Sequence, residues 1–244
     1  VGLGGSGTVD GGVGLASALG CRFLNGDGTD VRAHGNELSR FARIEPPDSH
    51  PLEGVHIIAA RDVDNLLTGA RGAARVFAPQ KGATSEQVEQ LEKGLANLRR
   101  LCADAGLTDG VDHPGDGSAG GLSFGLRVFA GAELVPGADV IIDALDLRRC
   151  ISESDLVITG EGRLDAQSTS GKAAWAVGRL ARELGVPCVC VPGALGEGWE
   201  DASSVFTRVV PSTPEGMDES EGVARAEEMI SQAVVRLSEL TQHR

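Results

Sequence analysis

The junction between an apolar run and a glycine-rich loop constrains the fold of this chain most. Residues 155–159 (DLVIT) have the pattern of a short buried strand, and they lead directly into residues 160–165 (GEGRLD). A helical pattern follows from Lys172 onward. Glycine adopts backbone conformations that other residues resist, and the free amides at the start of a helix attract anions. The junction therefore indicates an α/β fold and suits the binding of phosphate groups.

The composition also favours an α/β fold with an aliphatic core. The chain has 244 residues, of which 41% are hydrophobic, so it can bury a sizeable core in one large domain or two small ones. Aromatic residues make up only 3%, Tyr is absent, and Gly occurs 35 times. This much glycine indicates many tight loops between strands and helices.

The charge of the chain excludes one class of partner. The formal net charge is −13 and no block of basic residues is present, so most of the surface would repel a nucleic acid. ATP is not excluded, because local cations, backbone amides and a bound metal can outweigh a distant, screened charge. No apolar stretch is long enough to span a membrane and no signal peptide is visible, so we expect a cytoplasmic protein without a membrane partner.

The five cysteines have neither the spacing of a disulfide scaffold nor that of a zinc site. We therefore expect reduced thiols. Cys188 and Cys190 would lie on one face of a strand as small buried hydrophobic side chains. The histidines show no metal-binding spacing either.

Hydrophobic spacing predicts the elements of the first two thirds of the chain. Helices are expected at 13–19, from the capping box of Thr84 and Gln87 to Leu101, at 122–130, and at 148–153. Strands are expected at 56–60, 139–142 and 155–159, and residues 1–5 have the pattern of the last residues of a strand.

The remainder of the chain alternates regularly between helices and strands. Helices are expected at 172–184 and at 223–240, the latter with Ala226, Ile230, Val234 and Leu237 facing inward, and strands at 187–191 and 205–210. Strands separated by helices pair in parallel, whereas the long loops of the front part indicate a mixed sheet. We place a domain boundary near Asp165.

Two acids follow the strand expected at 56–60. Asp62 and Asp64 are two positions apart in an extended segment, so they point in one direction, and Asn65 adds a neutral oxygen. Such oxygens suit Mg²⁺, and a carboxylate here could instead accept the proton of a substrate hydroxyl. The alternative is an Asx turn that caps the next segment. The residues alone leave both interpretations open.

A second group of charges follows the strand expected at 155–159. Glu161, Arg163 and Asp165 alternate on one face if the chain stays extended. Arg163 could bind a phosphate or a substrate carboxylate in a bidentate manner while Glu161 or Asp165 holds a metal ion. Equally, Arg163 could neutralise its two acidic neighbours in a purely structural arrangement.

Two lysines are candidates for binding phosphate. Residues 166–172 fall short of a P-loop, because Ala166 replaces its first Gly and Ala173 stands where the P-loop has Ser or Thr. Lys172 could still balance phosphate charge, or it could pair with the acids at the strand end. Lys81 lies near an expected helix start, where most lysines are merely solvated.

Several blocks of sequence, taken in order, resemble one family. They are residues 2–6 (GLGGS), 10–12 (DGG), 62–65 (DVDN), 67–69 (LTG), 77–82 (FAPQKG) and 160–167 (GEGRLDAQ), with Gly171 and Lys172. Over essentially the whole chain these blocks resemble the bacterial class I glycerate kinases. The resemblance implies Mg²⁺- and ATP-dependent phosphorylation of D-glycerate to 2-phosphoglycerate, in the breakdown of organic acids.

The chain also departs from the pattern of that family. Residues that the family usually has are replaced by Gly7, Val9, Arg61, Leu66, Ala70, Asp116, Ser118 and Ala166. None of these changes removes the principal acids or Lys172. Members of the family look to have further chain ahead of Val1, so part of the active cleft is expected to be missing.

The resemblance implies two α/β domains. Residues 1–165 would form the larger, mixed-sheet domain, and residues 166–244 the second half of a smaller, Rossmann- or flavodoxin-like domain whose parallel sheet is incomplete. The strands near Val157 and Val189 would then expose edges. Reduced stability or formation of a homodimer is the expected consequence.

The residues and the resemblance together define a predicted site. The catalytic residues are predicted to be Asp62, Asp64, Arg163 and Lys172, the nucleotide-binding residues Gly4, Gly5, Ser6, Lys81, Gly160 and Gly162, and the metal ligands Asp64, Glu161 and Asp165. ATP and D-glycerate are the expected small-molecule partners. The rival hypothesis is an inactive module that binds glycerate or a nucleotide without turnover.

Overall fold

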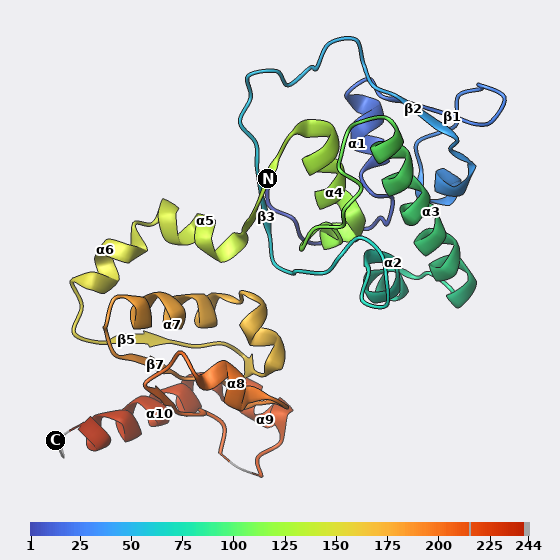
Figure 1. Cartoon of the computed structure of the whole chain (residues 1–244). Coiled ribbons are helices and arrows are strands. Elements are labelled where there is room, and N and C mark those ends of the chain that lie inside the picture. The colour runs from blue at the N-terminus through green and yellow to red at the C-terminus, as the bar shows by residue number, and fades with distance from the viewer. Residues whose placement is uncertain (215, 242–244) are drawn as a thin grey trace. The chain divides into compact units, whose positions relative to one another are not determined.

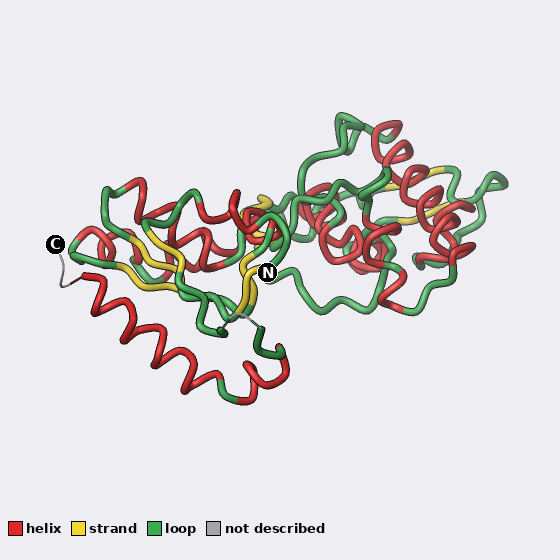
Figure 2. The backbone as a smooth tube through the Cα atoms, turned by 90° about the horizontal axis from the view of Figure 1, so that it is seen from below, coloured by secondary structure: helices red, strands yellow, loops and turns green. Residues whose placement is uncertain are grey.

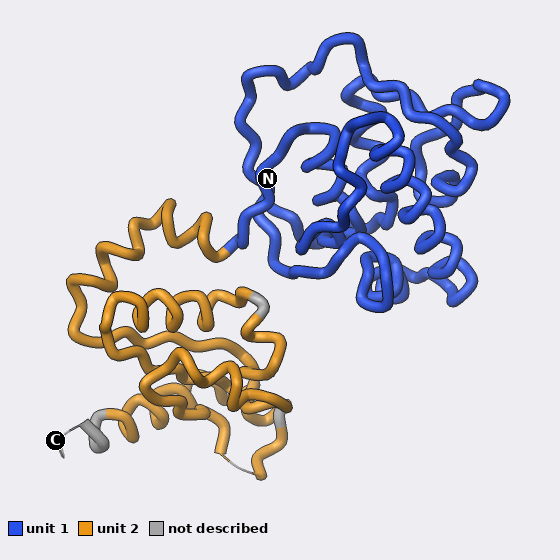
Figure 3. Tube along the Cα trace, in the orientation of Figure 1, with its two compact units in different colours: residues 1–137 blue, residues 138–244 orange. Residues whose placement is uncertain are grey.

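The computed structural model describes residues 1–214 and 216–241 and contains two compact units. The first unit spans Val1–Gly137 and the second spans Ala138–Arg244 (Figure 3). The sequence placed the boundary near Asp165 instead. The units divide earlier because Ile142 and Ile151 share a hydrophobic core with Leu180 of the second unit. The assignment of residues 1–165 and 166–244 to the two domains of the family stays a prediction.

The first unit combines a short parallel sheet, an antiparallel strand pair and several helices (Figure 1). Its elements are α1 (Val13–Ala18), β1 (Arg22–Leu24), η1 (Gly35–Arg40), β2 (Arg43–Glu45), β3 (Ile58–Arg61), α2 (Ala73–Phe77), η2 (Pro79–Lys81), α3 (Ser85–Asp104), α4 (Ser118–Ala130) and β4 (Glu133–Pro136). β1 pairs with β2 antiparallel and β3 pairs with β4 in parallel. The front part of the chain was predicted to form a mixed sheet. Both strand directions are present, but in two separate two-stranded sheets.

The first residues of the chain run beside β3. Gly2 forms a parallel bridge with Ala60, supported by bonds from Leu3 N to Ala60 O (2.9 Å) and from Ala60 N to Val1 O (2.8 Å). β3 consequently lies between residues 1–3 and β4. The strand-like pattern of the first residues is thus explained, and their carboxyl end points in the same direction as that of β3.

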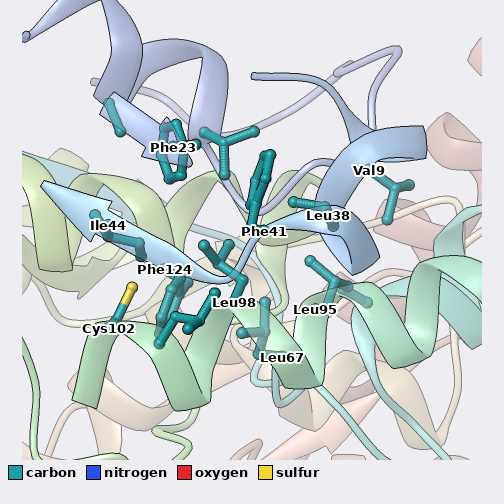
Figure 4. Close-up of a cluster of buried hydrophobic side chains, with 14 of the residues drawn as sticks. Val9, Phe23, Leu38, Phe41, Ile44, Leu67, Leu95, Leu98, Cys102 and Phe124 are labelled. Atoms are coloured by element: carbon teal, nitrogen blue, oxygen red, sulfur yellow. The ribbon is translucent and has the colours of Figure 1, made fainter. Parts of the chain in front are cut away.

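Helix α3 forms much of the core of the first unit (Figure 4). The predicted capping box closes its start, because Gln87 N donates to Thr84 Oγ1 at 3.3 Å and Thr84 N donates to Gln87 Oε1 at 2.9 Å. Leu95 and Leu98 are fully buried and belong to the same cluster as Phe124. Burial of one such leucine stabilises the fold by roughly 1.5–3 kcal/mol.

A left-handed turn opens helix α4. Ala119, Gly120 and Gly121 have φ values of 53°, 71° and 86°, so the regular helix begins after them, as the sequence predicted. A Cβ atom at Gly120 would overlap the carbonyl oxygen of Thr8, and Gly11 N donates to Gly120 O at 3.2 Å. Glycine at this position therefore lets residues 8–11 pack directly against the start of α4.

The second unit is built on a parallel sheet (Figure 2). Its elements are α5 (Gly137–Ala144), α6 (Leu147–Ser152), β5 (Val157–Thr159), β6 (Arg163–Leu164), η3 (Ala166–Ser170), α7 (Ala173–Glu183), β7 (Cys188–Cys190), β8 (Ala194–Leu195), α8 (Trp199–Ser203), β9 (Arg208–Val209), α9 (Glu219–Ala224) and α10 (Ala226–Thr241). The strand order is β5-β7-β9, and β6 and β8 form a second parallel pair. Cys188 packs toward α7 and Val189 toward α10, so helices cover both faces.

The edges of this sheet agree with the sequence at one strand only. β5 has β7 as its neighbour in the described sheet and forms an edge, as expected for the strand at Val157. The strand at Val189 was also expected to expose an edge. That expectation is wrong, because β7 lies between β5 and β9.

The strand predicted at 139–142 is also wrong. These residues belong to helix α5. Ala138 and Ile142 are four positions apart and pack into the core of the second unit, while Ile141 is 57% exposed. One apolar side chain in this segment therefore faces the solvent, and a run of aliphatic residues alone could not distinguish this helix from a buried strand.

Helix α10 buries a different stripe from the one predicted. Leu237 is buried as expected, and Met229 and Ala233 complete the buried stripe. Ile230 and Val234 are 48% and 42% exposed, and Ala226 is exposed as well. The stripe is shifted because Ala233 and Leu237 pack against Val189 and Val191 of the sheet.

Two further expectations concern the cysteines and the membrane. All five cysteines are free thiols, and only Cys150 is exposed. Burial raises the pKa of Cys188 to about 11 and is the largest cause of the rise at Cys190, to about 12. Within the described part of the chain, no helix combines the length and the hydrophobicity that a membrane span requires.

Candidate active site

Two predicted loops of the first unit leave neighbouring parallel strands at the same end. The glycine-serine loop (residues 4–6) follows the residues paired with β3, and the acidic loop (residues 62–65) follows β3 itself. Ligand sites favour the carboxyl ends of parallel strands in α/β proteins. A Cβ atom at Gly4 or Gly5 would meet nothing within 4 Å, so the glycine-serine loop borders open space. The topology thus brings the two predicted loops to one end of the same short sheet.

Lys81 contacts the glycine-serine loop directly. Its Nζ donates to Ser6 Oγ at 2.9 Å and to Thr8 O at 2.8 Å. Burial lowers the pKa of Lys81 from its ordinary value, and the nearby carboxylate of Asp10 opposes this shift. The sequence left Lys81 ambiguous, and its place at the end of η2 explains the contact. A partly buried cation therefore lies beside this loop.

The two acids of the acidic loop have different surroundings. Asp64, although 57% exposed, forms an ion pair with Arg61, whose side chain is 15% exposed and also donates to Val63 O at 3.3 Å. Asp62 is exposed, and among residues 1–214 and 216–241 its carboxylate has no hydrogen-bond or ion-pair partner. Sequence reasoning noted Arg61 only as a departure from the family pattern. The structure shows that this arginine holds Asp64.

Three predicted residues of the second unit form one charged cluster. The Nζ atom of Lys172 lies 3.8 Å from Glu161 Oε2 and 3.5 Å from Asp165 Oδ1. The Glu161 side chain is only 13% exposed, and its Oε1 atom is buried without a hydrogen-bond partner in the described part of the chain. Asp165 also caps η3, since its Oδ1 accepts from Gln167 N at 2.9 Å. Lys172 therefore pairs with the strand-end acids, one of the two alternatives for this residue.

Arg163 lies in β6 and lines a hollow of about 420 Å³. Asp165, Gln167 and Glu197 line the same hollow. A Cβ atom at Gly196 would lie 3.2 Å from Arg163 Cδ, so this glycine leaves room for the arginine stem. The long side chain of Arg163 thus reaches a concave surface of the second unit.

Gly160 and Gly162 border a second, larger hollow of about 580 Å³. Its other walls include Glu161 and the exposed apolar side chains of Ile230 and Val234. A Cβ atom at Gly160 would lie 2.6 Å from Val191 O, so glycine here is required by backbone packing. At Gly162 a Cβ atom would meet nothing within 4 Å, which leaves this backbone accessible.

The predicted metal ligands do not form a three-ligand cluster. In the described ranges, no group of three or more His, Cys, Asp or Glu side chains is close enough to hold a metal ion. Glu161 and Asp165 both approach Lys172, while Asp64 belongs to the first unit. The two carboxylates of the second unit, Glu161 and Asp165, still suit Mg²⁺. This ion commonly takes one or two carboxylates and completes its shell with water and phosphate oxygens.

Comparison with known proteins decides the family. The sequence model described as the glycerate kinase family matches residues 1–242. The chain belongs to the glycerate kinase family. This confirms the resemblance that the sequence blocks indicated.

Individual glycerate kinases are similar to most of the chain. The glycerate kinase of Halalkalibacterium halodurans is 36% identical over 96% of this chain and 62% of its own length. The glycerate 2-kinase of Escherichia coli K12 is 38% identical over 80% of this chain and 51% of its own length. The chain thus spans about half to two thirds of these curated relatives.

A solved structure agrees with the fold. A crystal structure from Salmonella typhimurium LT2, described as glycerate kinase 2, matches with a TM-score of 0.73 and 35% identity. The match covers 99% of this chain and 64% of that chain. The α/β fold class expected from the sequence is confirmed, with parallel and antiparallel sheets.

Proposed function

We propose that this chain phosphorylates D-glycerate with ATP and produces 2-phosphoglycerate. The observation that carries the proposal is the contact of Lys81 with Ser6 at the strand end that also bears the acidic loop. Phosphoryl transfer requires mainly alignment and neutralisation of charge, and these groups provide both. The relatives named glycerate kinase and glycerate 2-kinase support the substrate and the position of the phosphate.

In the first unit, Lys81 and the glycine-serine loop would bind phosphate oxygens. An ammonium group has three N–H donors, and Ser6 and Thr8 accept from two of them. The third can donate to an anion at the loop. Asp62 would accept the proton of the glycerate hydroxyl, because its carboxylate is exposed and not engaged by Arg61, unlike that of Asp64.

In the second unit, Glu161 is the metal ligand that the surroundings support best. Its buried Oε1 atom is a hard oxygen acceptor without a hydrogen-bond partner in the described residues. When bound, Mg²⁺ would neutralise the charge of the phosphate oxygens. Lys172 would bind phosphate, and Arg163 would bind an anionic group, a carboxylate or a phosphate, through two N–H groups. Asp165, with Oδ1 accepting from Gln167 N, would add a second carboxylate oxygen.

The assay that tests the proposal measures release of ADP from Mg-ATP with and without D-glycerate. We expect ADP release that depends on glycerate, and a product that enolase converts directly, as 2-phosphoglycerate requires. A product that enolase accepts only after addition of a phosphoglycerate mutase would contradict the assigned hydroxyl. No glycerate-dependent ADP would contradict the kinase proposal for this chain.

One alternative stays open, an inactive module that binds glycerate or a nucleotide. The observation that favours it is the pairing of Lys172 with Glu161 and Asp165, which engages a cation predicted to bind phosphate. Calorimetric binding of ATP or glycerate without turnover in the same preparation would support this alternative. Turnover would reject it.

Replacement of Lys81 by Met is expected to weaken ATP binding about 10- to 100-fold, the effect of losing one hydrogen bond from a charged donor. Because burial lowers the pKa of Lys81, the wild-type chain should lose affinity for ATP as the pH rises from neutral toward the ordinary lysine range. Protonated Lys81 binds the anion and neutral Lys81 does not, so Lys81→Met should lack this alkaline loss. Calorimetry over this pH range measures both effects.

The matched control is Lys93→Met, a change at an exposed lysine of α3. It should leave the affinity for ATP within about twofold of the wild type, because exposed charges are strongly screened. Equal losses in the two variants would show that Lys81 acts only through net charge.

A further inference from the structure

The residues that follow the acidic loop are held by one carboxylate, that of Asp112. Asp112 Oδ1 accepts from Leu67 N at 2.7 Å, and its Oδ2 accepts from Thr68 N at 3.0 Å and from Thr68 Oγ1 at 2.9 Å. The Asp112 side chain is only 9% exposed. Three donors from one short segment therefore converge on a single carboxylate.

Arg99 balances the charge of this carboxylate. Its Nη1 lies 2.9 Å from Asp112 Oδ2 and also donates to Thr68 Oγ1 at 3.1 Å. An unpaired buried carboxylate would be costly, and the arginine removes that cost. The charge of Asp112 is thus balanced within the group of Asp112, Arg99 and Thr68.

Other hydrogen bonds also hold the same segment. Residues 62–67 form neither helix nor strand, so their position depends on tertiary contacts. Gly115 N and Gly117 N donate to Asn65 O at 3.2 Å and 2.9 Å, and Ser118 Oγ donates to Val63 O at 3.1 Å. These bonds fix the middle of the segment, whereas Asp112, together with the bond from Ala73 N to Leu67 O (3.0 Å), fixes its end. Leu67 is fully buried and belongs to the core of the first unit.

We propose that Asp112, supported by Arg99, is a positioning residue for phosphoryl transfer. It fixes the backbone at Leu67 and Thr68 and thereby the direction in which Asp62 and Asp64 leave β3. Its carboxylate is occupied by protein donors, so it acts through the acidic loop and does not touch substrate. This inference rests on the proposed function for its effect on rate, and on the contacts alone for its effect on the loop.

The test compares Asp112→Asn with the wild-type chain by two measurements. An Asn side chain keeps the size of Asp112 but turns an NH₂ group toward the backbone donors of Leu67 and Thr68. We therefore expect the rate of amide hydrogen exchange in residues 62–69 to rise at least about tenfold, while exchange in α3 stays unchanged. The kcat should fall about 10- to 100-fold, because a misplacement of about 1 Å can cost 100-fold, and the KM for ATP should stay within about threefold.

Matched variants keep the test decisive if Asp112→Asn folds poorly. Thr68→Val keeps the shape but removes the hydroxyl, and with it the bonds to Asp112 and from Arg99. It should lower kcat about fivefold, whereas Thr68→Ser should restore it. Arg99→Met should resemble Asp112→Asn. Arg100→Met is the control, since Arg100 is 57% exposed and pairs only with Asp104 and Asn97 of its own helix in the described residues.

The outcomes separate the inference from the proposed function. Faster exchange with unchanged kcat would show that Asp112 is merely structural, and unchanged exchange would overturn the inference whatever the rate. The exchange measurement needs no turnover. If the wild-type chain does not phosphorylate glycerate, the proposed function fails, and exchange in residues 62–69 still decides whether Asp112 fixes the acidic loop.

Discussion

Asp62→Asn should lower the kcat of glycerate phosphorylation by at least about 100-fold, the lower end of what a positioned general base contributes. Asp62 lies directly after β3, is exposed, and has no partner among the described residues that would compete for its carboxylate. Asn has nearly the same shape but cannot accept the proton of a hydroxyl. Because a base acts in the transition state, the KM for ATP should change by less than about threefold. Steady-state kinetics with coupled detection of ADP measures both constants.

Asp64→Asn tests the neighbouring acid. We expect a smaller loss of kcat, about tenfold or less, because Asp64 is paired with Arg61 and its removal mainly releases that arginine. Asp48→Asn, at an exposed position of the same unit, should have no effect beyond about twofold. A full rate in Asp62→Asn together with a large loss in Asp64→Asn would reverse the roles assigned to the two acids.

Local patterns predicted the parts of this structure that depend on neighbouring residues in the sequence. The capping box at Thr84 and the leucine spacing that follows it specify α3, because both arise within a few turns of helix. The loops at the ends of β3 and β5 were predicted because a short apolar run followed by glycines and acids is a local signal. Consequently, the predicted strand-end loops are present in both units.

Contacts distant in sequence explain what the patterns could not show. Lys81 is far in sequence from Ser6, and Asp112 from Thr68, so no spacing rule relates them. The buried stripe of α10 is set by Val189, a residue of the sheet, rather than by the helix itself. The roles of the predicted site residues stay predictions, whereas the loops at 4–6, 62–65 and 160–162 follow strand residues in the structure.

Asp116→Ala should reduce the free energy of unfolding of the first unit by about 3 kcal/mol, the lower end of the cost of breaking a buried ion pair. Asp116 is fully buried, and it accepts from Arg127 Nε at 2.8 Å, from Arg127 Nη2 at 2.7 Å and from His113 N at 2.9 Å. The Arg127 side chain is 22% exposed and lies over the ring of Phe124. Removal of the carboxylate would leave this guanidinium without its charge partner.

Denaturant unfolding can locate the loss in one unit. The chain has two tryptophans, Trp175 and Trp199, and both lie in the second unit, so their fluorescence serves as an internal reference. Asp116→Ala should shift the transition seen by circular dichroism to lower denaturant, and by more than the transition seen by fluorescence. A loss below about 1 kcal/mol would show that Asp116 and Arg127 are not energetically coupled in the way the geometry indicates.

The double variant Asp116→Ala/Arg127→Met tests whether each residue of this pair serves mainly to balance the charge of the other. Asp116→Ala alone removes the carboxylate but leaves the arginine behind. Met keeps most of the apolar stem of Arg127 against Phe124 without a charge. Replacing both members of a buried pair by apolar groups is often neutral, so the double variant should recover most of the lost stability. Recovery would show that Asp116 and Arg127 stabilise the unit mainly by compensating each other's charge.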